Sequence, residues 1–204
     1  MSSTVIDIHS KDIPAAADVL TAAFRGDPLF AYIFGNLEHY NRAAPWMFAT
    51  WVRWVMLYGK AWATPNIEAV ALRKVPGNYH VSPWSIIRSG MLPTPIKLGM
   101  ETYRRFDRVV TLLEKKHDEL MGMSPHWYCE CIAVVPGQQG KGLGKLLMEH
   151  TFQMAYADGL PCYLETASEK ALSIHLKHGY EVRETVQVPD SELKICLMVR
   201  PHRQ

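Results

Sequence analysis

A glycine-rich turn connects a strand pattern to a helical pattern in the segment Ile132-Ala-Val-Val-Pro-Gly-Gln-Gln-Gly-Lys-Gly-Leu-Gly-Lys145. Glycines in such a turn let the backbone bend tightly and leave several N–H groups free to point at one spot. The helix that follows adds a partial positive charge at its N-terminus, and Lys141 and Lys145 flank the turn. The segment therefore predicts a cradle for a pyrophosphate group.

Three phosphate-binding motifs compete for this turn, and the spacing excludes two of them. Gly140, Gly142 and Gly144 follow the pattern GxGxG, which differs from the GxGxxG of dinucleotide-binding folds. Leu146 stands where the Walker A motif requires a hydroxyl side chain. The third motif is the coenzyme A signature (Gln/Arg)-x-x-Gly-x-(Gly/Ala), which Gln139-Gly-Lys-Gly-Leu-Gly144 satisfies.

With this motif the chain resembles the GNAT superfamily of acetyl-CoA-dependent N-acetyltransferases. A second block agrees, since Leu164-Glu-Thr-Ala-Ser-Glu-Lys-Ala-Leu-Ser-Ile-His-Leu-Lys-His-Gly-Tyr180 is similar to the family's Leu-Glu-Thr strand and the helix that ends in Gly-Phe. Its spacing is similar to that of the puromycin N-acetyltransferase type. The resemblance is strong over residues 126–185, weaker over 1–75, and absent across 76–125.

The chain as a whole is mixed α/β, with a strand–helix–strand–helix order in its C-terminal half. The resemblance implies a GNAT-type fold, in which helices flank a central mixed sheet of six to seven strands. We expect one domain over residues 1–204, with a helical insertion over about 76–125 between the third and fourth strands. Strands are expected at 5–9, 60–64, 68–74, 127–135, 162–166, 180–188 and 192–200, and helices at about 14–25, 41–58, 102–121, 142–157 and 169–178.

Composition narrows the class of protein. The chain has 204 residues, of which 48% are hydrophobic and 21% charged, so it is long and apolar enough to bury a core. A net charge of +2 gives no electrostatic case for nucleic-acid binding. No apolar run approaches the roughly 20 residues of a membrane span, and the N-terminus lacks a signal-peptide pattern. We therefore predict a cytoplasmic monomer or homodimer that binds neither membranes nor nucleic acids.

The 4 cysteines include no CxxC pair, which removes the usual zinc and redox signals. Cys129 and Cys131 stand two apart in one strand, so alternation places both side chains on one face, where they are poorly placed to bridge each other. His175 and His178 share a helix face, but no third ligand completes a recognisable motif. The sequence predicts reduced thiols and no metal site.

The resemblance implies acetyl-CoA as co-substrate and places its binding residues. Family members splay two neighbouring strands, here Trp127–Val135 and Cys162–Thr166. The pantetheine arm then hydrogen-bonds to one strand as an added strand does. The residues expected to bind acetyl-CoA are Ile132, Ala133 and Val134 for pantetheine, and Gln139, Gly140, Lys141, Gly142, Leu143, Gly144 and Lys145 for pyrophosphate.

The expected proton donor departs from the family pattern. Relatives usually protonate the departing thiolate with a Tyr four residues before the Gly-Phe pair, and that position is His175 here. Ala171 stands in place of the preceding helical Asn. An imidazolium with a pKa of about 6.5 is acidic enough to protonate a thiolate of pKa about 8.5. The alternative is that His175 merely packs near the coenzyme.

Two carboxylates are candidates for the base that receives the amine proton. Glu130 lies mid-strand, where alternation predicts Tyr128, Ile132 and Val134 on the same face. A carboxylate among such apolar neighbours costs free energy, which indicates a functional role. Glu165 matches the Glu of the Leu-Glu-Thr block, which is the base in some members. A strand-end carboxylate that bonds nearby backbone is the structural alternative for Glu165, so Glu130 is slightly preferred.

Three hypotheses about function follow. The first is acetyl transfer to a small-molecule amine by direct attack in a ternary complex, with Phe24, Phe30, Tyr32 and Phe34 suited to an apolar amine pocket. The second is modification of a protein N-terminus or lysine, against which the insertion counts because it narrows the cleft. The third is a non-catalytic coenzyme A-binding module, supported only by the missing Tyr and Asn.

Overall fold

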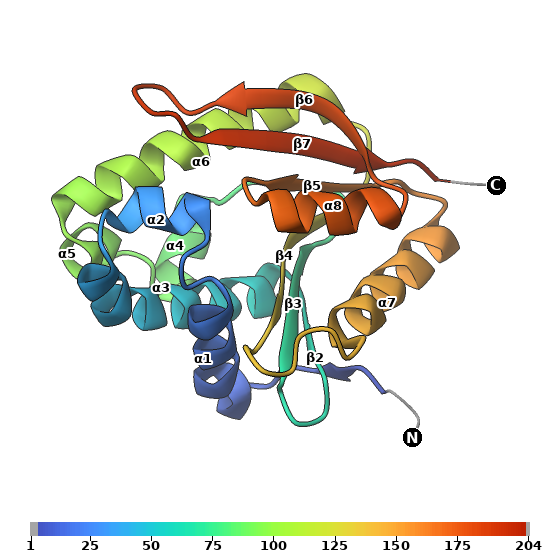
Figure 1. Cartoon of the computed structure of the whole chain (residues 1–204), viewed down its shortest axis with the longest axis horizontal. Coiled ribbons are helices and arrows are strands. Elements are labelled where there is room, and N and C mark those ends of the chain that lie inside the picture. The colour runs from blue at the N-terminus through green and yellow to red at the C-terminus, as the bar shows by residue number, and fades with distance from the viewer. Residues whose placement is uncertain (1–3, 203–204) are drawn as a thin grey trace.

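The computed structural model describes residues 4–202, which form one seven-stranded sheet with helices on both faces (Figure 1). The strand order is β1-β2-β3-β4-β5-β7-β6, in which β4 and β5 are parallel and the other neighbours antiparallel. This arrangement confirms the expected mixed α/β fold. The strands are β1 (Ile6–Asp7), β2 (Gly59–Ala63), β3 (Ala69–Lys74), β4 (Trp127–Val134), β5 (Cys162–Thr166), β6 (Glu181–Gln187) and β7 (Lys194–Arg200).

Helices divide the core into two parts, one on each face of the sheet. A short 3-10 helix (Ser10–Asp12) leads into α1 (Ile13–Ala23), and α2 (Pro28–Phe34) and α3 (Leu37–Tyr58) complete the N-terminal set that packs on one face. The opposite face is covered by α7 (Leu143–Asp158) and α8 (Glu169–Lys177) (Figure 1). We call these the α3 face and the α7 face of the sheet.

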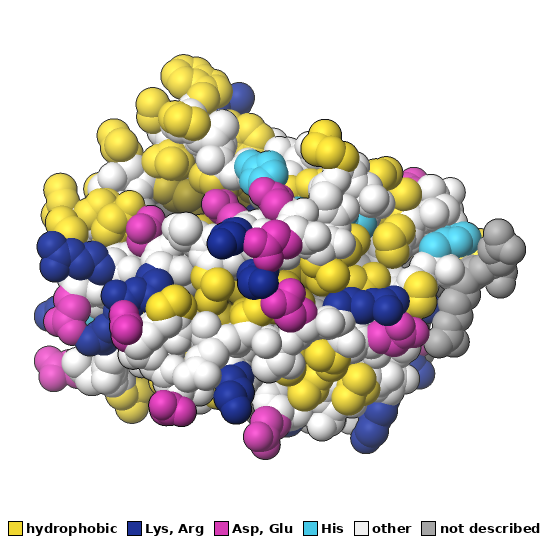
Figure 2. All heavy atoms as spheres, turned by 90° about the horizontal axis from the view of Figure 1, so that it is seen from above, with side chains coloured by type: hydrophobic (Ala, Val, Ile, Leu, Met, Phe, Trp, Pro, Cys, Tyr) yellow, Lys and Arg dark blue, Asp and Glu magenta, His cyan; other side chains and the backbone are white. Residues whose placement is uncertain are grey.

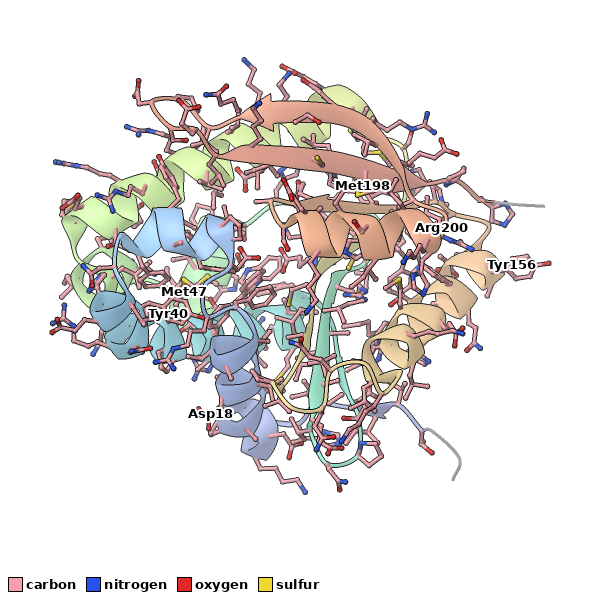
Figure 3. The ribbon with its side chains drawn as sticks, viewed as in Figure 1. Asp18, Tyr40, Met47, Tyr156, Met198 and Arg200 are labelled. Carbon is pink, nitrogen blue, oxygen red and sulfur yellow. The ribbon has the colours of Figure 1, made fainter. Side chains whose placement is uncertain are left out.

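Capping explains where the N-terminal helices begin. Asp27 accepts a hydrogen bond from the Leu29 N–H at 2.9 Å and is followed by proline in the first turn, which starts α2. Asn36 accepts from the His39 N–H at 2.8 Å, so α3 begins at Leu37, earlier than the expected start near residue 41. The Tyr40 hydroxyl donates to the Thr21 carbonyl at 2.8 Å and ties α3 to α1; Figure 3 labels Tyr40 at that end of α3.

The segment between β3 and β4 contains helices that the sequence patterns missed. In the described chain it folds as α4 (Pro83–Ser89), α5 (Thr94–Leu98) and α6 (Met100–Met121), of which only α6 was expected. The prolines of α4 and α5 stand at the start of each helix, where the missing N–H costs nothing, so they begin helices instead of breaking them. The Trp54 indole of α3 donates to the Ser85 hydroxyl of α4 at 3.0 Å and anchors the insertion.

The part of this insertion that contains α4 and α5 exposes several apolar side chains. Trp84 of α4 is 65% exposed and Ile96 of α5 is 85% exposed, and Ile87 and Leu92 are exposed between them. Figure 2 shows hydrophobic side chains gathered on a projection at the upper edge of that view, on the side where α4 lies. Within the described part of the chain, no helix is both long enough and apolar enough to span a bilayer.

A bulge in β4 changes which side chains share a face. Leu72 of β3 pairs with Cys131 and Arg73 pairs with Cys129, so Glu130 is left opposite no residue of β3. Such a bulge reverses the alternation of side chains beyond it. Cys131 therefore packs on the α3 face and Cys129 on the α7 face, so the prediction of a shared face was wrong. All 4 cysteines are free thiols, as expected.

The same bulge corrects the expected surroundings of Glu130. Its carboxylate contacts the Trp51 indole of α3, so its side chain lies on the α3 face with that of Tyr128. Ile132 and Val134 pack on the α7 face instead. Alternation alone misplaced them, because one extra residue in a strand shifts all later side chains to the other face.

Candidate active site

The glycine-rich turn forms an open cradle at the start of α7. Gly137, Gly140 and Gly142 adopt φ values of +88°, +80° and +84°, which only glycine adopts without strain. Apart from the adjacent residues, no heavy atom of the described chain lies within 4 Å of a Cβ built on any of the three, so nothing crowds the turn at these glycines. α7 begins at Leu143, directly after Gly142. Its first N–H groups lack intrahelical partners, and the turn therefore fits an anion.

Polar side chains brace the cradle and add positive charge. Gln139 Nε2 donates to the Val134 carbonyl at 3.3 Å, and Lys170 of α8 donates to Gln139 Oε1 at 3.1 Å. Lys141 donates to Gln138 Oε1 at 2.6 Å. Lys145 is 63% exposed, with its ammonium 3.5 Å from Glu149 one turn along α7. Two exposed lysines thus stand at the mouth of a helix N-terminus.

The strands β4 and β5 separate beside this cradle. Their parallel ladder runs from the pair Trp127–Cys162 to the pair Cys129–Leu164 and stops there, although β4 continues to Val134. Beyond that point β4 remains paired with β3 through residues 131–134. Alternate residues of an edge stretch direct their N–H and C=O groups away from the paired neighbour. Part of the backbone of β4 beyond Cys129 is therefore not hydrogen-bonded to β5.

Glu165 lies at the point of separation, on the α3 face. Its carboxylate accepts a hydrogen bond from the Tyr163 hydroxyl at 2.8 Å and another from the Tyr128 hydroxyl. Burial raises the pKa of Glu165 to about 7, against the two tyrosine hydrogen bonds and the charge of Lys74, which lower it. Burial also raises the pKa values of both tyrosines, so they remain protonated donors. A carboxyl group that titrates near neutral pH is suited to take up a proton.

Glu130 lies on the same face of the sheet as Glu165, but its hydrogen-bond partners differ. One oxygen is 3.0 Å from the Lys74 ammonium and the other accepts from the Trp51 indole at 2.5 Å. The side chains of Lys74 and Glu130 are 8% and 10% exposed, so this is a nearly buried ion pair. The Lys74 ammonium also lies 4.8 Å from the centre of the Tyr128 ring. Both carboxylate oxygens of Glu130 are thus occupied by cationic or polar partners.

His175 lies on the opposite side of the sheet from the two carboxylates. It is half-buried on α8, its ring centre is 5.5 Å from that of Tyr180, and its Nδ1 is buried without a hydrogen-bond partner in the described chain. Burial, with the charges of Arg73 and His178, lowers the pKa of His175 to about 4. The imidazole is therefore neutral at pH 7, and the expected route through an imidazolium donor is not present in the free protein.

Of the four aromatic residues expected to line an amine pocket, Phe24 and Tyr32 are half-buried, and the Tyr32 hydroxyl accepts a hydrogen bond from Arg108 of α6 at 3.2 Å. Phe30 and Phe34 are buried and belong to the core, Phe34 packing edge-on to Tyr40 at 5.1 Å. Phe24 and Trp51 are half-buried, and Phe48 stacks against both at 5.7 and 6.0 Å. Because the Trp51 indole also donates to Glu130, this aromatic cluster ends at the Glu130 carboxylate.

Sequence patterns found both carboxylates, His175 and the cradle, but missed the residues around them. Lys74 was treated as a strand end, and Tyr128 and Tyr163 as ordinary strand residues. The one sequence signal for these partners was a tyrosine at the second position of each of two neighbouring strands. The structure pairs these two residues, Tyr128 and Tyr163. Residues 4–202 contain no group of three or more His, Cys, Asp or Glu side chains that could hold a metal.

Comparisons with known proteins point to one family. Residues 102–180 match the model of the acetyltransferase (GNAT) family. An N-acetyltransferase of Schizosaccharomyces pombe, itself uncharacterised, is 27% identical over 197 residues, which cover 94% of this chain and 80% of that protein.

Two solved structures share the fold. Arylalkylamine N-acetyltransferase 2 from Aedes aegypti is 14% identical, with a TM-score of 0.69 and 100% of each chain covered. An acetyltransferase of Corynebacterium glutamicum from the group of histone acetyltransferase HPA2 and related acetyltransferases is 20% identical, with a TM-score of 0.68 and coverage of 100% and 98%. At these identities the likeness is one of fold.

Proposed function

The chain belongs to the acetyltransferase (GNAT) family, and we propose that it transfers an acetyl group from acetyl-CoA to a primary amine of a small molecule. The transfer proceeds by direct attack of the amine in a ternary complex. The observation that carries this proposal is the Glu165 carboxyl, which titrates near pH 7 and lies where β4 and β5 separate. A base so placed serves an amine that must lose a proton during attack.

The residues present fit acetyl-CoA. The cradle offers the free N–H groups and open glycines that a pyrophosphate needs, within residues Gln139 to Lys145. Residues 132–134 offer backbone groups beyond the end of the β4–β5 ladder. When bound, acetyl-CoA supplies the activated thioester. Residues 139–145 bind and orient it, and Glu165 removes the proton from the amine.

We assign the base to Glu165 in preference to Glu130, the residue that sequence reasoning favoured. Lys74 neutralises Glu130 at 3.0 Å, and a carboxylate that gave up this pairing to accept a proton would leave Lys74 nearly buried and uncompensated. Glu165 accepts only neutral hydroxyl donors, which tolerate its protonation. We propose that Glu130 and Lys74 act as a positioning pair that sets the charge around Glu165.

An aromatic or alkyl amine is the acceptor that the surroundings favour. Trp51 is half-buried and contacts Glu130, and Phe48 connects it to the half-buried ring of Phe24. An ammonium group is attracted both to aromatic faces and to carboxylates. The Aedes aegypti neighbour carries the name arylalkylamine N-acetyltransferase, which supports the same class. The insertion of α4–α6 beside α2 and α3 restricts the space open to a large protein substrate.

A panel of acceptors tests this proposal. Thiol release from acetyl-CoA is measured with arylalkylamines, polyamines, lysine peptides and peptides with free N-termini at equal concentration. We expect the highest kcat/KM with small amines, aromatic ones leading. Turnover confined to peptides would replace the proposal with the protein-acetylation alternative. Binding of acetyl-CoA with no turnover of any acceptor would favour a non-catalytic module.

The cradle makes a separate prediction about affinity. Lys145→Glu should weaken acetyl-CoA binding about tenfold at low salt, with the loss shrinking as salt is added, because a charge at the helix N-terminus then repels the pyrophosphate. A glutamate in the first turn interacts favourably with the helix dipole, which offsets the loss of the exposed ion pair with Glu149, so the fold is kept. Calorimetric titration with acetyl-CoA measures the effect.

The matched control is Lys115→Glu on α6. Lys115 is 71% exposed and stands one turn from Glu119, as Lys145 stands one turn from Glu149, so both variants make the same charge change in the same local setting. Equal affinities for the two variants would contradict the cradle. Charge reversal is a sharper probe than Gly142→Val, because valine at a φ of +84° strains the backbone by itself.

We also propose that the chain acts as one domain, with 76–125 as its insertion, in the reducing cytoplasm. Free thiols at positions 129, 131, 162 and 196 support that compartment. Burial raises the pKa of Cys162 to about 11 and those of Cys129 and Cys131 above the usual range, so these thiols are unreactive at neutral pH.

A further inference from the structure

Arg73 of β3 is completely buried, which is rare for arginine. Its Nε donates to the Thr151 hydroxyl of α7 at 2.9 Å. Its Nη1 donates to the Leu72 carbonyl at 2.8 Å and to the Cys131 carbonyl at 2.7 Å. A guanidinium has five N–H donors, and these bonds use three of them. The remaining two are on Nη2, which has no hydrogen-bond partner within residues 4–202.

The charge of Arg73 is also uncompensated. No carboxylate within residues 4–202 forms a salt bridge with it, although a buried charge without a counterion costs free energy. A buried cation with unused donors is a candidate binding site for an anion. The titratable groups on which its charge acts are Cys129, Cys131, His150, Cys162, His175 and Tyr180.

A second unpartnered polar atom lies in the same region. His175 Nδ1 is buried without a partner in the described chain, and the positive charge of Arg73 is close enough to His175 to act on its protonation. Arg200 adds a further cation, stacked 4.0 Å from the Phe152 ring and bonded through Nε to the His178 carbonyl at 3.1 Å. Figure 3 labels Arg200 where the end of β7 meets α7 and α8.

Arg73 lies next to residues 132–134, which we propose for the pantetheine arm that ends in the thioester. The Cys131 carbonyl that Arg73 grips belongs to the bulge, two residues beyond the last β4–β5 pair at Cys129. The guanidinium therefore stands on the α7 face at the point where β4 leaves β5. Glu165 stands at the same point on the α3 face, so the sheet separates a proton acceptor from a cation.

We propose that Arg73 Nη2 and His175 form a binding site for the sulfur of coenzyme A, which lets the thiol leave as a thiolate. The amine nitrogen forms its bond to the acetyl carbon, and its proton goes to Glu165. The electron pair of the broken carbon–sulfur bond stays on sulfur, opposite the guanidinium. No imidazolium is required, since the neutral ring of His175 contributes only a hydrogen bond. The inference rests on the proposed use of acetyl-CoA.

The test compares two ligands on the wild-type chain. Coenzyme A has a thiol, whose free pKa is about 8.5, and acetyl-CoA has none. If the site favours the thiolate, the bound thiol has a lower pKa and binding releases a proton. The affinity for coenzyme A then rises up to tenfold per pH unit between the bound and free pKa values. Calorimetry measures the Kd of each ligand from pH 6 to 9. The ratio of the two Kd values is the readout, because any titration that affects both ligands alike cancels in it.

We expect the ratio to move at least tenfold in favour of coenzyme A between about pH 6.5 and 8.5. A ratio that stays constant with pH overturns the inference while leaving the proposed function standing. Failure of both ligands to bind would overturn the two together. Ultraviolet absorbance of the bound thiolate gives a second, independent reading of the same pKa.

Two variants locate the effect. Arg73→Met keeps the length of the side chain and removes the charge, so the ratio should become nearly independent of pH. Because Arg73 donates hydrogen bonds to two carbonyls, the fold of Arg73→Met is checked by circular dichroism. If Arg73→Met does not fold, Arg73→Lys, which keeps the positive charge, is measured in its place. His175→Phe, at a half-buried position, should reduce the shift by about threefold, the effect of one hydrogen bond. An unchanged ratio in folded Arg73→Met contradicts the site.

Discussion

Glu165→Gln is expected to lower kcat/KM at pH 7.5 by about 10²- to 10⁴-fold, the usual range for removal of a general base. The wild-type profile should rise with pH through a pKa near 7, because burial holds the Glu165 pKa there and only the carboxylate accepts the proton. The variant should lack this limb and recover at high pH, where the free amine is abundant. A profile of kcat/KM with one small amine from pH 5.5 to 9.5 measures both.

The same substitution should stabilise the fold at pH 8. The pKa of Glu165 is raised in the folded chain from 4.5 to about 7, so the folded state binds this proton more tightly than the unfolded state. Stability from this group is present below pH 4.5 and lost as pH rises to 7. Replacing the carboxylate with an amide should raise the free energy of unfolding by about 1–3 kcal/mol at pH 8 and leave it unchanged at pH 4. Destabilisation at both pH values would identify Glu165 as a structural residue.

Glu130→Gln is the matched comparison, since it makes the same chemical change on the neighbouring strand. We expect the pH profile of kcat/KM to keep its rise near pH 7, shifted modestly to lower pH. The reason is that the charge of Glu130 raises the pKa of Glu165, so its removal lowers that pKa. Loss of the limb in Glu130→Gln with survival in Glu165→Gln would transfer the role of base to Glu130.

Lys74→Met should have the largest effect on stability, about 3–5 kcal/mol. The Lys74 ammonium lies 3.0 Å from Glu130 in a pair whose side chains are 8% and 10% exposed, and the variant leaves that carboxylate nearly buried without its cation. Lys74 also lowers the pKa of Glu165, so the acidic limb of the rate profile should move to higher pH. Urea unfolding at pH 7.5 measures the loss, and assays at low temperature measure the limb.

The double variant Lys74→Met/Glu130→Gln provides the control. Removing both charges is close to neutral for stability where removing one is costly, because the penalty comes from the unpaired partner. Glutamine still accepts the Trp51 indole hydrogen bond that the carboxylate accepts at 2.5 Å. We expect the double variant to regain most of the lost stability. A double variant as unstable as Lys74→Met would show that packing of the lysine stem, and not the pair, is what matters.

Much of the fold could be predicted from two short blocks of sequence. The glycine spacing at residues 137–144 implied a strand, a tight turn and a helix, and the structure has β4, positive φ values and α7 at those places. Prolines misled the prediction within the insertion, since those of α4 and α5 start helices, and a proline gives the same sequence signal at a helix start and in a loop.

Candidate site residues could be picked out from the sequence, but their surroundings could not. Glu130 and Glu165 were both candidates, and alternation along one strand could not rank them, because their partners come from elsewhere: Lys74 from β3 and Tyr128 from β4. The bulge at Glu130 was equally invisible, since it is an offset between two strands and not a property of either. His175 looked like an acid until burial lowered its pKa to about 4.

The sequence by itself determined the backbone of the cradle, because glycine at positive φ and a helix start are decided by residues adjacent in the chain. Tertiary structure alone decided which carboxylate is neutralised, which titrates near pH 7, and that Arg73 is a buried cation with two free N–H groups. The physical reason is that protonation depends on desolvation and on charges within a few ångströms, and here those charges come from strands and helices far apart in sequence.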